Sequence, residues 1–147
     1  MKSHFRPKMS PTTGLLRVPG RELPFTLKDL RAWLIACSGD PLGLDADKLI
    51  WSCAYCTRLL PLDNVELDHV EPVKRGGNLG LSNLAIACTI CNREKGEMTA
   101  EEYRALIRGL DTFPQAARNY IRKCLRTAAM GARMRFHPRD QKGEIEE

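Results

Sequence analysis

Three stretches of the chain carry apolar side chains at helical spacing. Residues 26–39 and 99–109 each open on a capping-box pattern, in which a threonine is followed three positions later by an acidic residue. Residues 114–130 form the third stretch, with a proline in its first turn. Apolar residues three or four positions apart predict an amphipathic helix in each stretch. Cys37 and Cys124 lie on the apolar sides of the first and third helices, so we expect both to be core residues.

The middle of the chain has a different pattern, with short strands in place of long helices. Residues 65–70 alternate apolar and polar side chains over most of their length, as a half-buried strand does. The Arg-Gly-Gly-Asn sequence of residues 75–78 is a turn signal, and residues 84–87 are a second short apolar strand. The segment after Cys88 can begin a short helix. These elements predict an α+β fold, in which a small strand–strand–helix core is flanked by α-helices.

The size and composition of the chain argue against a membrane protein and against a secreted protein. With 147 residues there is room for one compact domain, and 43% hydrophobic and 28% charged residues are ordinary values for a globular protein. The longest apolar run, Ala32–Cys37, is six residues long, whereas a bilayer-spanning helix needs about 20. No apolar core follows the basic N-terminus, so we expect no secretory signal. We therefore expect no membrane association and a cytoplasmic location.

The net charge of +5 is distributed unevenly along the chain. Residues 1–21 carry five basic side chains and no acidic one, whereas residues 22–111 carry ten basic and fourteen acidic side chains. Residues 112–139 carry seven basic side chains and no acidic one, and residues 140–147 carry one basic and four acidic. Basic flanks around an acidic middle indicate a polyanionic partner such as nucleic acid. Two solvated, soluble ends account for the charge alone equally well.

Four of the six cysteines form two Cys-x-x-Cys pairs, Cys53 with Cys56 and Cys88 with Cys91. A two-residue gap lets two thiolates converge on one ion, so two such pairs predict a tetrahedral four-cysteine Zn²⁺ site. This zinc is structural, because four thiolates leave no open coordination position. Structural zinc contributes roughly 10–16 kcal/mol, enough to hold a short, loop-rich segment together. The alternative is one redox-active pair beside two buried cysteines.

Several short motifs follow one another in order between and after these pairs. They are Asp68-His69, Pro72, Gly76-Gly77, Asn83-Leu84, Cys91-Asn92 and Lys95. Together with the cysteines, this order resembles the HNH endonuclease family, in the form whose ββα-metal (His-Me) finger is braced by zinc on four cysteines. The resemblance covers about a third of the chain, residues 53–96. It implies a ββα-metal fold and metal-dependent hydrolysis of phosphodiester bonds.

The resemblance also implies roles for four residues. His69 looks like the general base that deprotonates the attacking water, and Asp68 looks like a ligand of the catalytic divalent metal. Asn83 matches the asparagine that pins the loop between the strands, and Asn92 stands where the second metal ligand is found. An asparagine there makes the chain an HNN variant, and its oxygen donor suits Mg²⁺ or Mn²⁺. The alternatives are a structural histidine, a turn cap at Asn83 and a helix-start residue at Asn92.

Basic residues in and beyond this motif are candidates for contact with DNA. Arg93 and Lys95 lie beside the last asparagine of the motif and could neutralise phosphates. Arg118, Arg122 and Arg126 are spaced four residues apart and form a basic ridge along one side of the third helix. Because this part of the chain contains no acid, we expect the arginines to repel one another and to bind phosphates instead. A solvated helix face is the alternative.

These observations divide the chain into five segments. They are a flexible basic arm (1–24), an N-terminal helical segment (25–50), an HNH nuclease core (51–98), C-terminal helices with a basic face (99–139) and an acidic tail (140–147). The arm is assigned because its residues include four prolines and few large apolar side chains.

The leading hypothesis is a metal-dependent DNA endonuclease or nickase acting on double-stranded DNA, with structural Zn²⁺ and catalytic Mg²⁺ or Mn²⁺. The main alternative is a zinc-stabilised nucleic-acid-binding module without catalytic activity, which has no need of Asp68, His69 and Asn92 as a set. A redox- or zinc-responsive interaction protein is a third hypothesis. One active site cuts one strand, so a double-strand break requires successive nicks, a homodimer or a larger nuclease or packaging assembly. The sequence leaves this choice open, together with the recognition site and the biological setting.

Overall fold

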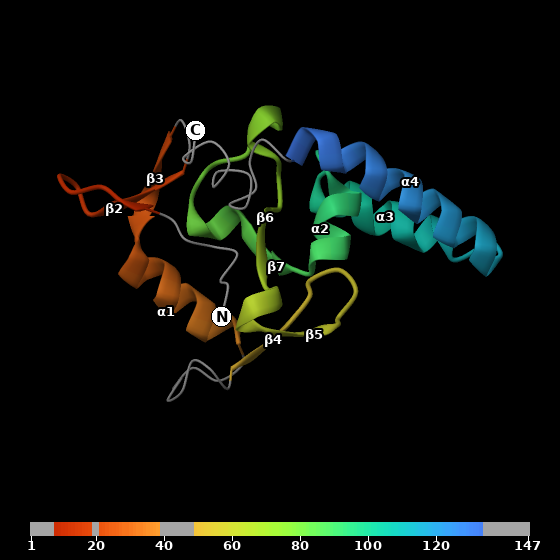
Figure 1. The fold of residues 1–147 in the computed structure, drawn as a ribbon, viewed down its shortest axis with the longest axis horizontal. Helices are drawn as coiled ribbons and strands as arrows, with labels where there is room; N and C mark the ends of the chain where they lie inside the picture. Colours follow the sequence, from red (N-terminus) through yellow and green to blue (C-terminus); the bar gives the residue numbers. More distant parts are fainter. Residues whose placement is uncertain (1–7, 19–20, 39–48, 134–147) are drawn as a thin grey trace, which may run out of the picture.

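The structure is a computed structural model that describes residues 8–18, 21–38 and 49–133 of the chain. Over these residues the fold is α+β, as predicted, with three small antiparallel sheets and four α-helices (Figure 1). The strands are β1 (Lys8–Met9), β2 (Leu15–Val18), β3 (Arg21–Thr26), β4 (Ile50–Ser52), β5 (Leu59–Pro61), β6 (Glu66–His69) and β7 (Leu84–Ala87). The helices are α1 (Leu27–Cys37), α2 (Thr89–Lys95), α3 (Ala100–Leu110) and α4 (Gln115–Arg133).

The described N-terminal part of the chain is a three-stranded sheet and not the expected flexible arm. Strands β1, β2 and β3 pair antiparallel in chain order. Leu16, Leu23 and Phe25 are buried in one cluster with Leu30 of α1. Alternate side chains of β3 face this cluster, and burial of these few apolar groups stabilises the short strands. The arm predicted for residues 1–24 is therefore wrong over the described part of that range.

Helix α1 begins with the predicted capping box. The Thr26 hydroxyl accepts a hydrogen bond from the Asp29 amide at 3.2 Å, and the Asp29 carboxylate accepts one from the Thr26 amide at 3.0 Å. The predicted end at Gly39 lies outside the described residues. Cys37 is exposed, so its assignment to the core is wrong. In the described part of the chain, Leu30 is the buried residue of this helix, and Cys37 is the last residue of the helix, seven positions later.

Strands β6 and β7 form a central hairpin at the predicted positions. Their register pairs Asp68 with Ala85 and His69 with Leu84. One apolar cluster contains Ile86 of β7 together with Trp51 of β4, Leu60 of β5, Cys91 of α2 and Tyr103 of α3. The N-terminal cluster of Leu16, Leu23, Phe25 and Leu30 packs against Leu84, at the start of β7. In Figure 1 the hairpin accordingly lies between the β2–β3–α1 part of the molecule and the α2–α3–α4 part.

Helices α3 and α4 follow α2 in the chain, and α4 packs against α2 (Figure 1). The capping box of Thr99 and Glu102 is present, and α3 continues one residue past the predicted stop at Gly109. Helix α4 begins where expected and extends three residues beyond the predicted end. Cys124 is exposed, so its assignment to the core is also wrong, because α4 is partly buried along a strip that does not include this side chain. Among the helices of the described residues, none has the length and apolar character that crossing a membrane requires.

Candidate functional site

The four paired cysteines converge, although the two pairs lie far apart in sequence. Cys53 and Cys56 occupy the turn between β4 and β5, Cys88 follows β7, and Cys91 lies in the first turn of α2. All four sulfur atoms lie within 4.8 Å of one another, and Cys56 Sγ is 3.8 Å from Cys88 Sγ. A regular tetrahedron with Zn–S bonds of ~2.3 Å has S···S edges of about 3.8 Å. The cluster is therefore compatible with the predicted zinc site.

Local hydrogen bonds prepare these sulfur atoms to carry negative charge. The Cys53 sulfur accepts from the amides of Tyr55 and Cys88, both at 3.4 Å, and the Cys88 sulfur accepts from the Cys91 amide at 3.3 Å. Hydrogen bonds from the thiols of Cys88 and Cys91 hold the pKa of Cys53 far below its ordinary value. The same contacts raise the pKa of Cys88 to about 11 and raise that of Cys91 further. A bound dication stabilises the thiolate form of all four cysteines.

Asp68 lies on the face of β6 that is covered by α2, and it is only 3% exposed. Each of its carboxylate oxygens accepts a hydrogen bond from a different part of the chain. The Tyr55 hydroxyl donates to Oδ2 at 2.6 Å, and the Lys95 ammonium donates to Oδ1 at 3.2 Å. The pKa of Tyr55 is raised, first by its burial and then by the Asp68 charge, so this phenol is a donor. The predicted metal ligand is therefore an oriented, buried carboxylate.

Asn92 faces the same strand from α2, and its partner is a residue that the sequence analysis did not single out. The Asn92 amide nitrogen donates to Glu66 Oε1 at 2.8 Å, and Thr89 donates to the other Glu66 oxygen. Glu66 and Asp68 are two positions apart on β6 and so share a face. An ionised carboxylate can only accept hydrogen bonds, so Glu66 fixes which end of the Asn92 amide turns toward it. In the sequence, the alternating pattern of residues 65–70 is the signal that could have identified Glu66 as a neighbour of Asp68 on the same face of the strand.

His69 is the last residue of β6, and strand alternation turns its side chain away from the Asp68 face. Its carbonyl oxygen accepts a hydrogen bond from Lys95 Nζ at 2.7 Å. The next residue is tied to the second strand, because the Val70 amide donates to the Asn83 carbonyl at 2.8 Å. The backbone on both sides of the imidazole is thus held in place.

Asn83 is buried and bridges the loop between β6 and β7. Its Oδ1 accepts from the Glu71 amide at 2.9 Å, and its Nδ2 donates to the carbonyls of Glu71 at 2.9 Å and Asn78 at 2.8 Å. The two glycines of the loop make this geometry possible. Gly76 has φ +97°, and a Cβ atom on Gly77 would overlap the Glu71 carbonyl.

The β4–β5 turn, the β6–β7 hairpin and helix α2 therefore bring together the paired cysteines, the Asp-His end of β6, the bridging asparagine and the α2 asparagine. Residues 53–97 match the HNH endonuclease family. The resemblance predicted from the sequence is thus confirmed for this segment, which we call the HNH segment. HNH endonucleases are metal-dependent nucleases that act on nucleic acids. No curated protein matches the chain.

Lys95 of the HNH segment is an interior residue and not the phosphate-binding surface residue that we expected. It is 1% exposed, and its ammonium is occupied by Asp68 and the His69 carbonyl. Desolvation of a lysine is unfavourable without such partners, so its burial depends on the Asp68 charge. Arg93, the other candidate on α2, is half-buried.

The basic ridge on α4 has acidic partners outside its own segment. Arg122 Nε lies 2.9 and 3.0 Å from the two oxygens of Glu94, and an Arg126 nitrogen lies 2.6 Å from one of them. The Glu94 side chain is fully buried between α2 and α4, where it also accepts from the Tyr103 hydroxyl at 2.6 Å. The argument that these arginines repel one another for want of an acid is therefore wrong. Their charges anchor α4 to the HNH segment.

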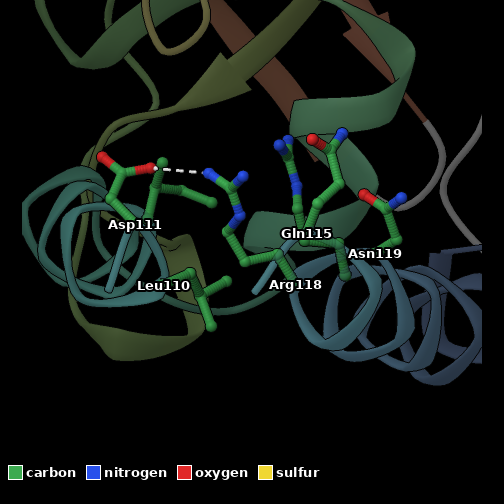
Figure 2. Close-up of a pocket in the computed structure, with 7 residues that line it drawn as sticks. Leu110, Asp111, Gln115, Arg118 and Asn119 are labelled. Atoms are coloured by element: carbon green, nitrogen blue, oxygen red, sulfur yellow. Dashed lines mark hydrogen bonds and ion pairs between the residues drawn. The ribbon is translucent and has the colours of Figure 1, made fainter. Parts of the chain in front are cut away.

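Arg118, the first residue of the ridge, lies in a hollow of about 120 Å³ between the end of α3 and the start of α4. Figure 2 shows Arg118 directed toward Asp111, with Gln115 and Asn119 on the α4 side. The two charged groups are 3.5 Å apart, and the Asp111 side chain is 68% exposed. Such an exposed pair contributes little to stability. Arg118 therefore has a different environment from Arg122 and Arg126, which share Glu94, despite the regular spacing of the three.

Proposed function

We propose that the chain is a metal-dependent DNA endonuclease, with His69 as the general base and with Asp68 and Asn92 as ligands of the catalytic divalent ion. The observation that best supports this proposal is the β6–α2 interface. There a buried carboxylate and an oriented amide project from neighbouring positions beside the Asp-His end of the strand. An HNH segment that served only to bind nucleic acid would not require this buried polar set.

His69 is suited to accept a proton from water in phosphodiester hydrolysis. Neutral imidazole is available near pH 7, and general-base catalysis contributes typically 10²–10⁴-fold to a rate. The water oxygen forms the new bond to phosphorus while its proton passes to the imidazole, and the bond from phosphorus to the 3′ oxygen breaks. The contacts of Lys95 and Asn83 support this role, since they fix the backbone from which the imidazole projects.

The chemistry of the donor atoms fits a hard divalent ion. A carboxylate at Asp68 and an amide oxygen at Asn92 are the kinds of ligand that Mg²⁺ and Mn²⁺ prefer. When bound, such an ion supplies charge neutralisation at the scissile phosphate and at the departing oxygen. Glu66 supports the assignment of Asn92, because it takes the nitrogen of that amide and thereby selects its oxygen as the metal-binding end.

The substrate that fits the charge of the chain is DNA, with double-stranded DNA as the first choice. The N-terminal 21 residues carry five basic side chains and no acid. The segment from 112 to 139 carries seven basic residues, of which Arg118, Arg122 and Arg126 are paired with Asp111 and Glu94. Basic flanks of this kind bring a polyanion to an acidic middle that would otherwise repel it. One site per chain makes nicking the basic reaction, and a homodimer or a larger nuclease assembly would be needed for a concerted double-strand break.

The test is a supercoiled-plasmid nicking assay on the zinc-loaded full chain, with Mg²⁺, Mn²⁺ and no added divalent ion. We expect nicking that requires the divalent ion and falls by about 10²–10⁴-fold in His69→Ala. His4→Ala is the matched control and should behave as the unmodified protein does. Absence of cleavage with every ion, or equal cleavage by His69→Ala, would refute the enzyme and favour a zinc-stabilised nucleic-acid-binding module.

The non-catalytic alternative has one observation in its favour. Lys95 already neutralises the Asp68 carboxylate within the protein, so this carboxylate does not need a metal for its charge to be balanced. The alternative predicts DNA binding that is independent of Mg²⁺ and Mn²⁺. The nicking assay separates the two functions, because only the endonuclease converts supercoiled plasmid to the open circle.

A further inference from the structure

The Asp68 carboxylate is connected to both pairs of the four-cysteine cluster through residues that lie next to the cysteines in sequence. Its Oδ2 accepts from Tyr55, which lies between Cys53 and Cys56 in the first pair. Its Oδ1 accepts from Lys95, which is one helical turn after Cys91 on α2. The positions of the two donors therefore follow from the positions of the cysteines. A zinc ion that joins the two pairs also sets the distance between the two groups that hold Asp68.

The Tyr55 ring is itself fixed by its surroundings. It packs edge-on against Tyr103, with the ring centroids 5.2 Å apart and the planes at 83°. The guanidinium of Arg104 lies over the Tyr55 ring, 5.1 Å from its centroid. Such aromatic and cation–π contacts restrict the ring in addition to burying it. The hydroxyl is thus presented to Asp68 in one orientation, at 2.6 Å.

The two donors have unequal effects on the carboxylate. Lys95 is a buried cation and attracts both oxygens of Asp68, whereas Tyr55 is neutral and holds one oxygen by a short, directional hydrogen bond. Without the phenol, Asp68 would lose the directional hydrogen bond to Oδ2 and keep its attraction to the Lys95 ammonium, which favours rotation of the carboxylate toward Lys95. Such a rotation would turn the carboxylate away from a divalent ion.

We propose that Tyr55 is a positioning residue that keeps Asp68 oriented for the catalytic divalent ion, and that the zinc cluster thereby determines the affinity of the second metal site. This inference rests on the proposed endonuclease function. It goes beyond that function because it makes a residue inside a zinc-binding pair responsible for catalytic metal affinity. Zinc then affects the reaction through the hydrogen bond from Tyr55 to Asp68 as well as by stabilising the fold.

The test compares Tyr55→Phe with the unmodified protein and with Tyr120→Phe, a control on the 70% exposed tyrosine of α4. Binding of Mn²⁺ alone to the zinc-loaded full chain is measured by electron paramagnetic resonance of the free ion. Zinc content and the circular dichroism spectrum are measured on the same samples. We expect Tyr55→Phe to retain zinc and the spectrum while its Mn²⁺ dissociation constant rises about tenfold, as removal of one hydrogen bond to a charged group predicts. Tyr120→Phe should change none of these.

A nicking titration with Mn²⁺ provides the second readout. For Tyr55→Phe the Mn²⁺ concentration at half-maximal rate should rise about tenfold, while the maximal rate changes less than about threefold. Equal Mn²⁺ affinity in Tyr55→Phe and the unmodified protein, with nicking intact in both, would overturn the inference and leave the endonuclease standing. Loss of zinc from Tyr55→Phe would also overturn it, because the residue would then act through the fold. An unmodified protein that neither binds Mn²⁺ nor nicks DNA would overturn both proposals.

Discussion

The buried carboxylate of Glu94 is predicted to be a major source of stability for the packing of α4 on the HNH segment. The perturbation is Glu94→Gln, which keeps the shape of the side chain and removes its charge. Three groups donate to the carboxylate: the Tyr103 hydroxyl at 2.6 Å, Arg126 at 2.6 Å and Arg122 at 2.9–3.0 Å. The amide would keep one acceptor oxygen, and its NH₂ group would face a donor that it cannot satisfy.

The size of the effect follows from these contacts. A hydrogen bond to a charged group contributes about 1.5–3 kcal/mol, and breaking a buried ion pair costs about 3–5 kcal/mol. Because both arginine side chains are 33% exposed, water compensates part of the loss. We therefore expect the free energy of unfolding to fall by about 3 kcal/mol in Glu94→Gln.

Urea unfolding followed by circular dichroism measures this change. With a urea dependence of about 2 kcal/mol per molar, the midpoint should move down by about 1.5 M. Glu22→Gln, on an exposed carboxylate of β3, is the matched control and should change the midpoint very little. A loss below about 0.5 kcal/mol in Glu94→Gln would refute the anchoring role. If Arg122→Ala leaves the stability unchanged but weakens DNA binding, the anchoring role of Arg122 would be refuted and its predicted role in DNA binding would be supported.

Three further predictions concern other parts of the molecule. Removal of zinc by a strong chelator should unfold the part of the chain around the four-cysteine cluster, and unchanged near- and far-ultraviolet circular dichroism after verified zinc loss would contradict this. Asn83→Ala should lower the free energy of unfolding by about 2–4 kcal/mol in a urea titration, because it removes three hydrogen bonds to backbone groups, and a change below about 1 kcal/mol would contradict the bridging role. The pKa of Glu102 is lowered to about 2 by hydrogen bonds from Arg75 and the Thr99 backbone, so its stabilising contribution is present above about pH 4.5 and is lost as the pH falls through about 2. In Glu102→Gln the pH profile of unfolding should be flatter over this window, and an identical profile would show that the ion pair contributes nothing.

The elements of the HNH segment could be predicted closely because their signals are local. Strand alternation, a Gly-Gly turn and a Cys-x-x-Cys pair each depend on neighbours within a few positions, and β7 has the predicted bounds of residues 84–87. The convergence of the cysteine pairs also followed from chemistry, since one ion requires four ligands. The two capping boxes located the starts of α1 and α3 for the same reason.

Pairings between distant residues could not be predicted in this way. Glu94 lies 28 and 32 positions from the two arginines that it binds, so a search for acids within the arginine segment could not find it. In the sequence Lys95 looks like a surface residue, because its neighbours along the chain give no sign that it lies beside the buried Asp68, 27 positions away. The strands at the N-terminus were missed because their buried side chains, Leu16, Leu23 and Phe25, pack against Leu30 of α1, and a local pattern does not show this packing. Each error concerns which surfaces meet, which is decided by packing and not by local pattern.

The central claim, that His69 is the base of a divalent-ion-dependent nuclease, is tested most directly by chemical rescue. The nicking rate of His69→Ala is measured in Mn²⁺ with increasing free imidazole, with Asp68→Ala measured in parallel. We predict that imidazole restores nicking to His69→Ala in proportion to its neutral form and leaves Asp68→Ala inactive, because it can replace a base but not a metal ligand. Full activity of His69→Ala without imidazole, or equal rescue of both variants, would contradict the assignment.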